Sequence, residues 1–161
     1  MAERPHLDRV DRVLLTRLQE QGRITHAALA REVGLSAPSV QERIRRLEAA
    51  GVIRGYRAEV DAAALGQGLL VVVAITLDHH GEERVSAFRQ AIERLDEVVE
   101  CLYVTGASDF LVKVRVRDVD HYQRWLMTRL SQVPGIERVE SSVVLATFKD
   151  DDRVRLPLED Q

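Results

Sequence analysis

The sequence predicts an α+β fold of two domains, the first helical and the second built as βαββαβ. Three segments with helical spacing of apolar residues fill residues 1–60, whereas short apolar runs alternate with amphipathic segments over residues 69–149. The charge also changes, because residues 1–60 hold 11 basic and eight acidic residues and the remainder holds 12 and 18. We therefore expect a first domain over residues 1–60, a linker over 61–68, a second domain over 69–149 and a C-terminal tail over 150–161.

The totals are those of a soluble globular protein, with 45% hydrophobic and 30% charged residues. The longest apolar run, Leu69 to Ile75, suits a buried strand and is far shorter than the roughly 18 residues of a membrane span. The N-terminus has no apolar segment typical of a secretion signal. The single cysteine, Cys101, excludes an intramolecular disulfide and a cysteine-rich zinc site, and we expect it to be buried. These features predict a cytoplasmic protein.

The first two helices are delimited by capping residues. Asp8 is a suitable N-cap, and Asp11 three residues later completes a capping box, with Gly22 ending the helix. Thr25 begins the second helix, and Gly34 suits the left-handed position that ends it. Their inward-facing residues are expected to be Leu7, Val10, Leu14, Leu18, Leu29, Ala30 and Val33.

The third helix follows the second after a turn of about three residues. Ser36 is its expected N-cap, Pro38 lies in its first turn, and the helix runs to about Ala50. Its apolar stripe consists of Val40, Ile44 and Leu47. A short helix, a tight turn and a longer helix in direct succession form the helix-turn-helix layout, whose second helix enters the major groove of DNA.

The polar residues of the third helix are the candidate contacts to double-stranded DNA. We expect Ser39, Glu42, Arg43 and Arg46 to lie opposite the apolar stripe, with Gln41 and Arg45 beside it. Arg43 is long enough to reach guanine, whereas Arg45 and Arg46 are expected to hold phosphates. The alternative for any one residue is a solvated helix face with pairs such as Glu42–Arg46. The predicted DNA-binding set is Ser36, Pro38, Ser39, Gln41, Glu42, Arg43, Arg45, Arg46, Arg54 and Arg57.

The segment after the third helix, Val52 to Val60, is expected to be extended. Arg54 and Arg57 flank its centre, so it suits the wing of a winged helix-turn-helix with both arginines on the DNA backbone. It equally suits a strand that leads into the next domain.

The second domain is expected to follow the ferredoxin-like plan, with an antiparallel sheet and both helices on one face. Predicted strands cover residues 69–77, 98–105, 110–116 and 137–148, and predicted helices cover 82–95 and 119–132. The helices' inward residues are expected to be Val85, Phe88, Ile92, Leu95, Val119, Tyr122, Leu126, Leu130 and Val133. Because the first strand has few polar residues on either face, the open sheet face predicts a dimer interface, which Lys113 and Arg115 make mixed in character.

The hairpin between the second and third strands is a candidate small-molecule site. It consists of Thr105, Gly106, Ala107, Ser108 and Asp109. We expect Asp109 to hold the ammonium of an amino acid and the loop N–H groups to hold its carboxylate; an ordinary turn has the same composition. We find no metal-ligand spacing, no nucleophile–base arrangement and no phosphate-binding glycine loop, so we expect no cofactor and no enzyme.

The residues of both halves resemble the Lrp/AsnC (feast/famine) transcription regulators. In the first half the resemblance is carried by Leu7, Asp8, Asp11, Arg12, Leu15, Leu18, Gln19, Gly22, Arg23, Leu29, Ala30, Val33, Gly34, Leu35, Ser36, Arg43, Leu47, Glu48, Gly51, Val52, Ile53 and Tyr56. In the second half it is carried by the βαββαβ order, Gly106, Asp109, Pro134, Gly135 and Ile136. The resemblance implies sheet-mediated homodimers that assemble to tetramers or octamers on the nucleoid. It also implies an amino-acid effector bound between dimers near Gly106 to Asp109. Family members often carry threonine late in the last strand, where this chain has Val139 and Ser141, so Ser141 joins the predicted effector set.

Two other functions remain open at this point. Siroheme decarboxylases resemble the same two-domain plan and use histidine and arginine on a tetrapyrrole, for which this chain offers His79, His80 and His121. An amino-acid-binding assembly module that does not bind DNA is the second alternative. The complete third helix favours the DNA-binding regulator over both.

Overall fold

The computed structural model describes residues 6–79 and 81–156. The chain forms two compact units, which we describe separately. The first contains the described residues up to Glu59 together with those from Asp150 onward, and the second is Val60–Lys149. The C-terminal tail therefore belongs to the helical unit, although it follows the second unit in the sequence.

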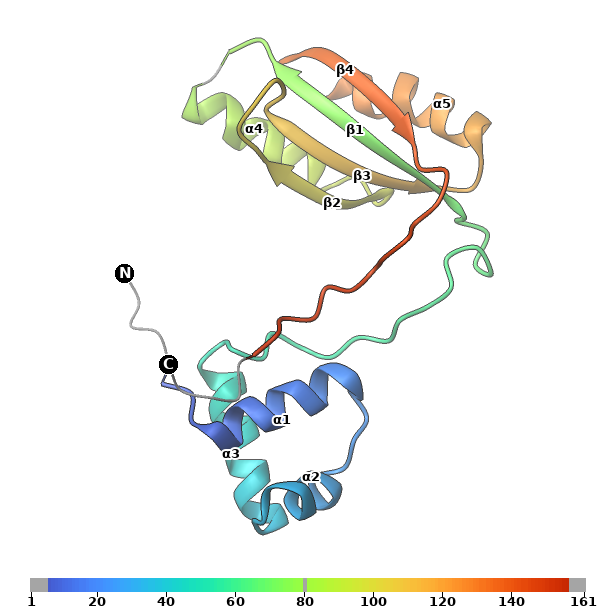
Figure 1. Ribbon diagram of the computed structural model, residues 1–161. Coiled ribbons are helices and arrows are strands. Elements are labelled where there is room, and N and C mark those ends of the chain that lie inside the picture. Colours follow the sequence, from blue (N-terminus) through green and yellow to red (C-terminus); the bar gives the residue numbers. More distant parts are fainter. Residues whose placement is uncertain (1–5, 80, 157–161) are drawn as a thin grey trace. The chain divides into compact units, whose positions relative to one another are not determined.

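The helical unit contains α1 (Arg9–Glu20), α2 (His26–Val33) and α3 (Ala37–Ala49), as the capping residues predict (Figure 1). Asp8 and Asp11 form the reciprocal capping box of α1, and Ser36 caps α3 by accepting from the Ser39 N–H. Gly34 ends α2 with φ of 68°, a left-handed conformation that glycine adopts without strain. The buried core that joins the three helices consists of Leu14, Leu29, Ala30, Val40 and Ile44.

The segment after α3 differs from the predicted wing. Gly51, with φ of 69°, redirects the chain, and Val52 to Val60 then pair with no strand among the described residues. A wing needs a second strand for its backbone hydrogen bonds, and the described part of this unit contains none. The unit is a three-helix helix-turn-helix followed by an unpaired connecting segment.

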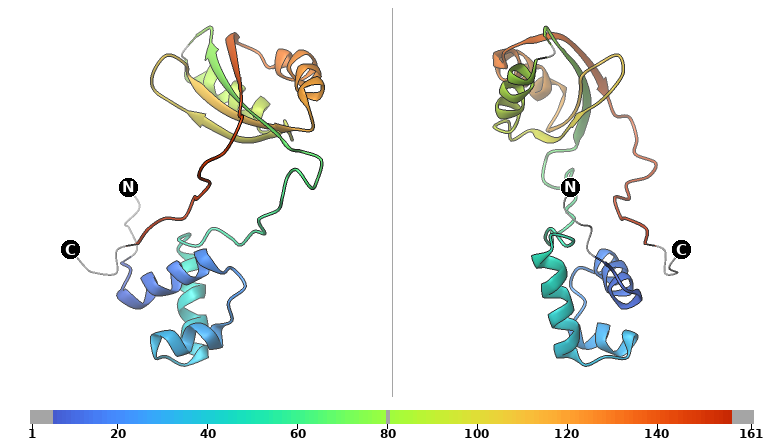
Figure 2. Two further views of the ribbon diagram at one scale, coloured as in Figure 1. Left: turned by 45° about the vertical axis from the view of Figure 1, so that its right-hand side comes forward. Right: turned by 90° about the vertical axis from the view of Figure 1, so that its left-hand side faces the viewer.

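The second unit confirms the ferredoxin-like prediction. It contains β1 (Leu69–Leu77), α4 (Glu82–Ile92), β2 (Val98–Tyr103), β3 (Phe110–Val116), α5 (Val119–Thr128), a 3₁₀ turn (Leu130–Gln132) and β4 (Ile136–Val143). The strands form one antiparallel sheet in the order β2-β3-β1-β4. Both helices cover the same face of this sheet (Figures 1 and 2).

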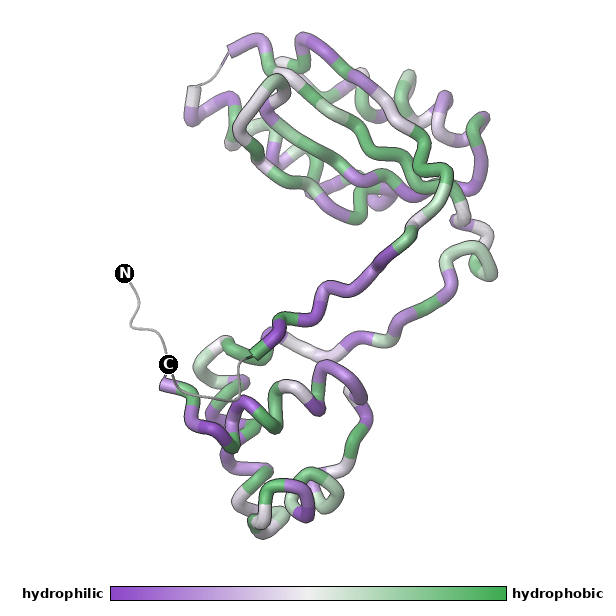
Figure 3. Tube along the Cα trace, in the orientation of Figure 1, coloured by the Kyte–Doolittle hydropathy of each residue, from purple (hydrophilic) through white to green (hydrophobic). Residues whose placement is uncertain are grey.

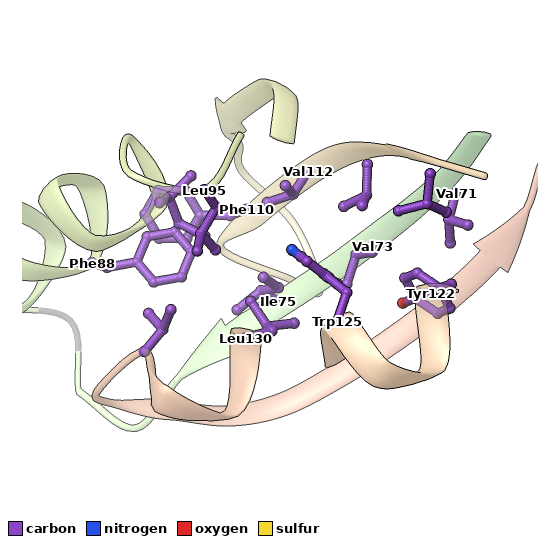
Figure 4. Close-up of a cluster of buried hydrophobic side chains, with 14 of the residues drawn as sticks. Val71, Val73, Ile75, Phe88, Leu95, Phe110, Val112, Tyr122, Trp125 and Leu130 are labelled. Atoms are coloured by element: carbon purple, nitrogen blue, oxygen red, sulfur yellow. The ribbon is translucent and has the colours of Figure 1, made fainter. Parts of the chain in front are cut away.

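The core of the second unit lies between the helices and the sheet (Figure 4). Alternate residues of β1 and β3 are buried there, because successive side chains of a strand point to opposite faces. Trp125 and Phe88 are the largest fully buried side chains, and the Phe88 ring lies 4.3 Å from that of Phe110. The buried strand residues are Val71, Val73, Ile75, Leu77, Phe110, Val112, Val114 and Val116.

The face of the sheet that carries no helix is mixed, as the sequence predicts. Leu70, Val72 and Ala74 of β1 are half-buried on it, and hydrophobic colour continues along β1 (Figure 3). Leu102 of β2 pairs with Leu111 of β3, so two large apolar side chains adjoin the β1 row. Lys113 and Glu100 form an ion pair of 2.7 Å beside them.

Three details of the second unit correct the predictions. Val119 is 60% exposed and not inward, because it is the first residue of α5 and the buried stripe begins at Tyr122. Cys101 is exposed, since β2 is an edge strand of the sheet. The last strand ends at Val143, so residues 144–149 are a connection rather than part of the sheet.

Candidate nucleic-acid interface and effector loop

The start of α1 is joined to α3 by an ion-pair network. Arg43 Nη1 lies 2.6 Å from Asp8 Oδ2 and 2.9 Å from Asp11 Oδ1, and Arg46 Nη2 lies 2.6 Å from Asp11 Oδ2. The Asp11 side chain is only 1% exposed, so two arginines compensate a buried carboxylate. The network connects the cap of one helix to the middle of another and fixes the direction of α3.

The electrostatics of this network favour the charged forms. The pKa of Asp8 is lowered from its usual value, chiefly by the hydrogen bond from the Asp11 N–H; burial opposes this lowering, and the hydrogen bond and charge of Arg43 add to it. The pKa of Arg43 is raised by its hydrogen bonds to Asp8 and then Asp11. The pairing of Asp8 with Arg43 therefore stabilises the charged form of each.

The prediction that Arg43 faces outward is wrong. Its side chain is 28% exposed and its two ion pairs are both with aspartates at the start of α1, because position 43 borders the apolar stripe through Val40 and Leu47. Arg46 is 57% exposed and keeps one side of its guanidinium toward solvent. Arg43 thus joins α3 to the start of α1, and its guanidinium is engaged there.

The outer face of α3 carries the other predicted residues. Pro38, Ser39, Gln41, Glu42 and Arg45 are exposed, while the apolar stripe is buried. The Ser36 hydroxyl caps the helix and lies 2.8 Å from that of Ser39. Within residues 6–79 and 81–156, no side chain hydrogen-bonds or ion-pairs with Arg45. This face offers one unengaged guanidinium, an amide, a carboxylate and a hydroxyl.

Arg54 and Arg57 lie on the connecting segment after α3, and both are exposed. Arg57 is engaged, because its Nη2 lies 2.5 Å from Asp152 Oδ2 of the C-terminal tail. The structure thus joins Arg57 to the acidic tail, a pairing that the sequence does not predict.

The predicted effector loop lies between β2 and β3, and Asp109 braces it. The Leu77 N–H donates to Asp109 Oδ2 over 2.8 Å, and the Asp109 N–H donates to the Ile75 carbonyl over 2.9 Å. Asp109 therefore fastens the start of β3 to the end of β1. Thr105, Gly106 and Ala107 are exposed, and Gly106 has φ of 130°, which favours glycine.

Ser141 does not join this loop. Its hydroxyl lies 2.5 Å from the Tyr122 hydroxyl of α5, on the side of β4 that faces the helices. Burial is the main reason that the pKa of Tyr122 is raised. Within one chain, the structure therefore does not bring the whole predicted effector set together.

Two further pairings are not predicted by the sequence. Arg84 of α4 pairs with Asp78 and packs over Gly135, and Gln19 of α1 hydrogen-bonds to Val154 of the tail. Neither pairing has a sequence signal: Asp78 and Arg84 are six residues apart, which is no helical spacing, and Gln19 and Val154 are 135 residues apart. Within the described ranges, no group of side chains suits a metal ion, and none of the helices combines the length and apolarity of a membrane span.

Family models match both halves of the chain. The model of the AsnC-type helix-turn-helix domain matches residues 7–48. The model of the Lrp/AsnC ligand binding domain matches residues 70–154, more than half of the chain. The two matches coincide with the helical unit and with the ferredoxin-like unit plus the first tail residues.

Full-length relatives have the same organisation. The chain is 39% identical over 148 residues to the leucine-responsive regulatory protein of Escherichia coli, covering 92% of this chain and 90% of that protein. Among solved structures, a transcriptional regulator from Neisseria meningitidis in complex with L-methionine has a TM-score of 0.87 at 27% identity, over 93% of this chain and 97% of that one. A feast or famine regulatory protein from M. tuberculosis complexed with L-methionine has a TM-score of 0.83 at 34% identity, over 94% and 100%.

Proposed function

The chain belongs to the Lrp/AsnC family of DNA-binding transcription regulators, and on that premise we propose that α3 reads duplex DNA and that the loop at residues 105–109 takes part in binding an amino acid. The observation that carries the first part is the exposed face of α3, whose apolar stripe is buried. As a working site of action we place the protein in the cytoplasm, on the nucleoid.

The DNA contacts divide into three groups. Ser39, Gln41 and Glu42 lie near the start of α3, where a recognition helix meets base edges. Arg45 and Arg46 supply charge to phosphates, and Arg54 extends that contact along the backbone, whereas Arg57 is paired with Asp152 of the tail. Arg43 is a positioning residue, because its guanidinium is used to hold α3 against α1.

We assign self-association to the open sheet face, and a dimer formed there would carry two copies of α3 related by a two-fold axis. The apolar row formed by Leu70, Val72 and Ala74, with Leu102 and Leu111 beside it, is the surface we assign to the dimer. Two helices related by a two-fold axis fit successive major grooves of a pseudo-palindromic site. Further assembly to tetramers or octamers would extend the contact along DNA.

Capture of genomic DNA by the purified protein tests the regulator directly. We expect enrichment of a discrete set of fragments that share a pseudo-palindromic element. Arg45→Ala should lower the amount of DNA captured at a given protein concentration without changing which fragments are enriched, whereas Arg94→Ala, an exposed arginine of the second unit, should leave both unchanged. Equal capture of all fragments by wild type would contradict sequence-specific regulation.

The effector part is supported by the two relatives whose structures contain L-methionine. Asp109→Asn removes the carboxylate charge but leaves an amide oxygen that can still accept from the Leu77 N–H. If Asp109 also holds the ligand's ammonium, calorimetric binding of L-methionine should weaken at least tenfold, the effect of losing about 1.4 kcal/mol. Unchanged binding would limit Asp109 to bracing the loop.

Tetrapyrrole chemistry, the main enzymatic alternative, gains no support from these relatives, all of which are regulators by name. The test is simple, because a bound tetrapyrrole changes its Soret absorbance. We expect no spectral change on adding siroheme to the purified protein.

A further inference from the structure

The C-terminal tail is fastened to α1 by a single glutamine side chain. Gln19 Nε2 donates to the Val154 carbonyl over 3.1 Å, and the Val154 N–H donates to Gln19 Oε1 over 2.7 Å. A glutamine side-chain amide has the same donor and acceptor groups as a peptide unit. The two reciprocal hydrogen bonds between Gln19 and Val154 therefore resemble those between directly opposed residues of two antiparallel strands. Gln19 therefore recognises the backbone of an extended segment.

A third hydrogen bond fixes the direction of the Gln19 amide. Nε2 also donates to the Leu15 carbonyl, one turn earlier in α1, over 3.3 Å. If the amide were flipped, its oxygen would face the carbonyls of Val154 and Leu15 and its nitrogen would face the Val154 N–H, so all three hydrogen bonds would be lost. The helix itself thus presents the amide to the tail.

The charged part of the tail makes a second contact with the same unit. Asp152 pairs with Arg57 over 2.5 Å, and Arg153 pairs within the tail with Asp151 over 2.7 Å. The hydrophilic run before Val154 is visible in Figure 3. Because Arg57 and Asp152 are 82% and 72% exposed, their pair adds little by itself. The Gln19 contact determines where the tail lies, and the ion pair supplements it.

We propose that the face of α1 that carries Gln19 is a docking site for the chain's own tail, residues 150–156, and that the docked tail is a second fastening between the two units. The chain leaves the helical unit after Glu59 and returns to it at Asp150, so two connections join the units. Docking at Gln19 anchors the second connection, which continues directly from β4. A movement of β4 can then be transmitted to α1 through the docked tail, without involving residues 60–68.

Amide hydrogen exchange of the full-length protein tests the docking. The Val154 N–H should exchange about tenfold more slowly than an unprotected amide, the factor expected for one ordinary hydrogen bond. Gln19→Ala should abolish this protection. Gln21→Ala is the matched control, since Gln21 is an exposed glutamine two residues away that has no hydrogen bond to the described tail residues, and it should leave the protection unchanged. An unprotected Val154 in wild type, or protection that survives Gln19→Ala, would overturn the proposal.

A mixed oligomer separates docking within one chain from docking onto a second copy. Isotope-labelled Gln19→Ala protein is mixed with an unlabelled chain that ends at Lys149. Docking within the chain leaves the labelled Val154 unprotected in the mixture. Recovery of protection would show that the tail seats on the partner's glutamine and would overturn the assignment to the chain's own tail.

Discussion

Arg43 of α3 and Asp11 of α1 face each other across the helical unit, with Nη1 2.9 Å from Oδ1 of a carboxylate that is almost fully buried. The same carboxyl group closes the capping box of α1 through the Asp8 N–H. One side chain therefore both caps a helix and holds the recognition helix. Arg45, two residues along α3, is exposed and has no side-chain partner among the described residues, so we propose it as the DNA contact.

Replacing Arg43 should mainly lower the stability of the helical unit, whereas replacing Arg45 should mainly weaken DNA binding. Arg43→Ala leaves Asp11 with a single arginine partner, so we expect the free energy of unfolding of the helical unit to fall by about 1.5–3 kcal/mol. Arg45→Ala should change stability by less than about 0.5 kcal/mol but should weaken DNA binding. Urea unfolding followed by circular dichroism and DNA titrations measure the two effects. Equal losses of stability in both variants would contradict the division of roles.

The helical unit should become less stable as the pH falls. The lowered pKa of Asp8 means that folding favours its ionised form, so this contribution is complete above the usual aspartate pKa and is lost as pH falls through the folded value. The protection factors of amides within α1–α3, measured against the intrinsic exchange rate at the same pH, should therefore fall below about pH 4. Asp8→Asn should reduce this pH dependence; an identical profile in the variant would show that other groups cause it.

A single charged substitution tests whether the open sheet face is the dimer interface. Leu111→Glu places a carboxylate in the apolar row without touching the core, since Leu111 lies on the face opposite the helices. We expect folded protein of lower molar mass in light scattering and weaker DNA binding, because burying an unpaired charge at an interface is costly. Val99→Glu, on the exposed edge strand, is the control for added charge. An unchanged oligomer would move the interface elsewhere.

Gly135 should tolerate alanine less well than Gly66. Both have left-handed φ values, 81° and 72°, and we expect strain of about 1 kcal/mol in each alanine variant. An added Cβ at Gly135 would also lie 2.5 Å from Arg84 Cδ, whereas nothing lies within 4 Å of one at Gly66. Displacing Arg84 from Asp78 adds up to about 1 kcal/mol. Fluorescence of Trp125, the only tryptophan, reports unfolding of this unit, and adding Arg84→Ala should remove the difference.

The sequence predicts the local features of this protein well and its long-range pairings poorly. Caps at Asp8, Thr25 and Ser36, and the alternation along β1, depend on neighbours within a few residues. Helical periodicity places Arg43 at the border of the apolar stripe and leaves open whether it faces solvent or α1; the position of α1 decides this. The tail looks like a separate part from the sequence, since no local pattern connects Val154 with a residue 135 positions earlier.

The salt dependence of DNA binding tests the central claim, that the exposed face of α3 binds DNA through its unengaged arginine. Affinity for a captured fragment is measured by fluorescence anisotropy between about 50 and 200 mM salt for wild type and Arg45→Ala. We predict a steep decrease for wild type, and for Arg45→Ala a weaker affinity with a log–log slope smaller by about one, as expected when a single phosphate is no longer neutralised. A wild-type affinity that does not change with salt, or an Arg45→Ala variant with wild-type affinity and slope, would contradict the account.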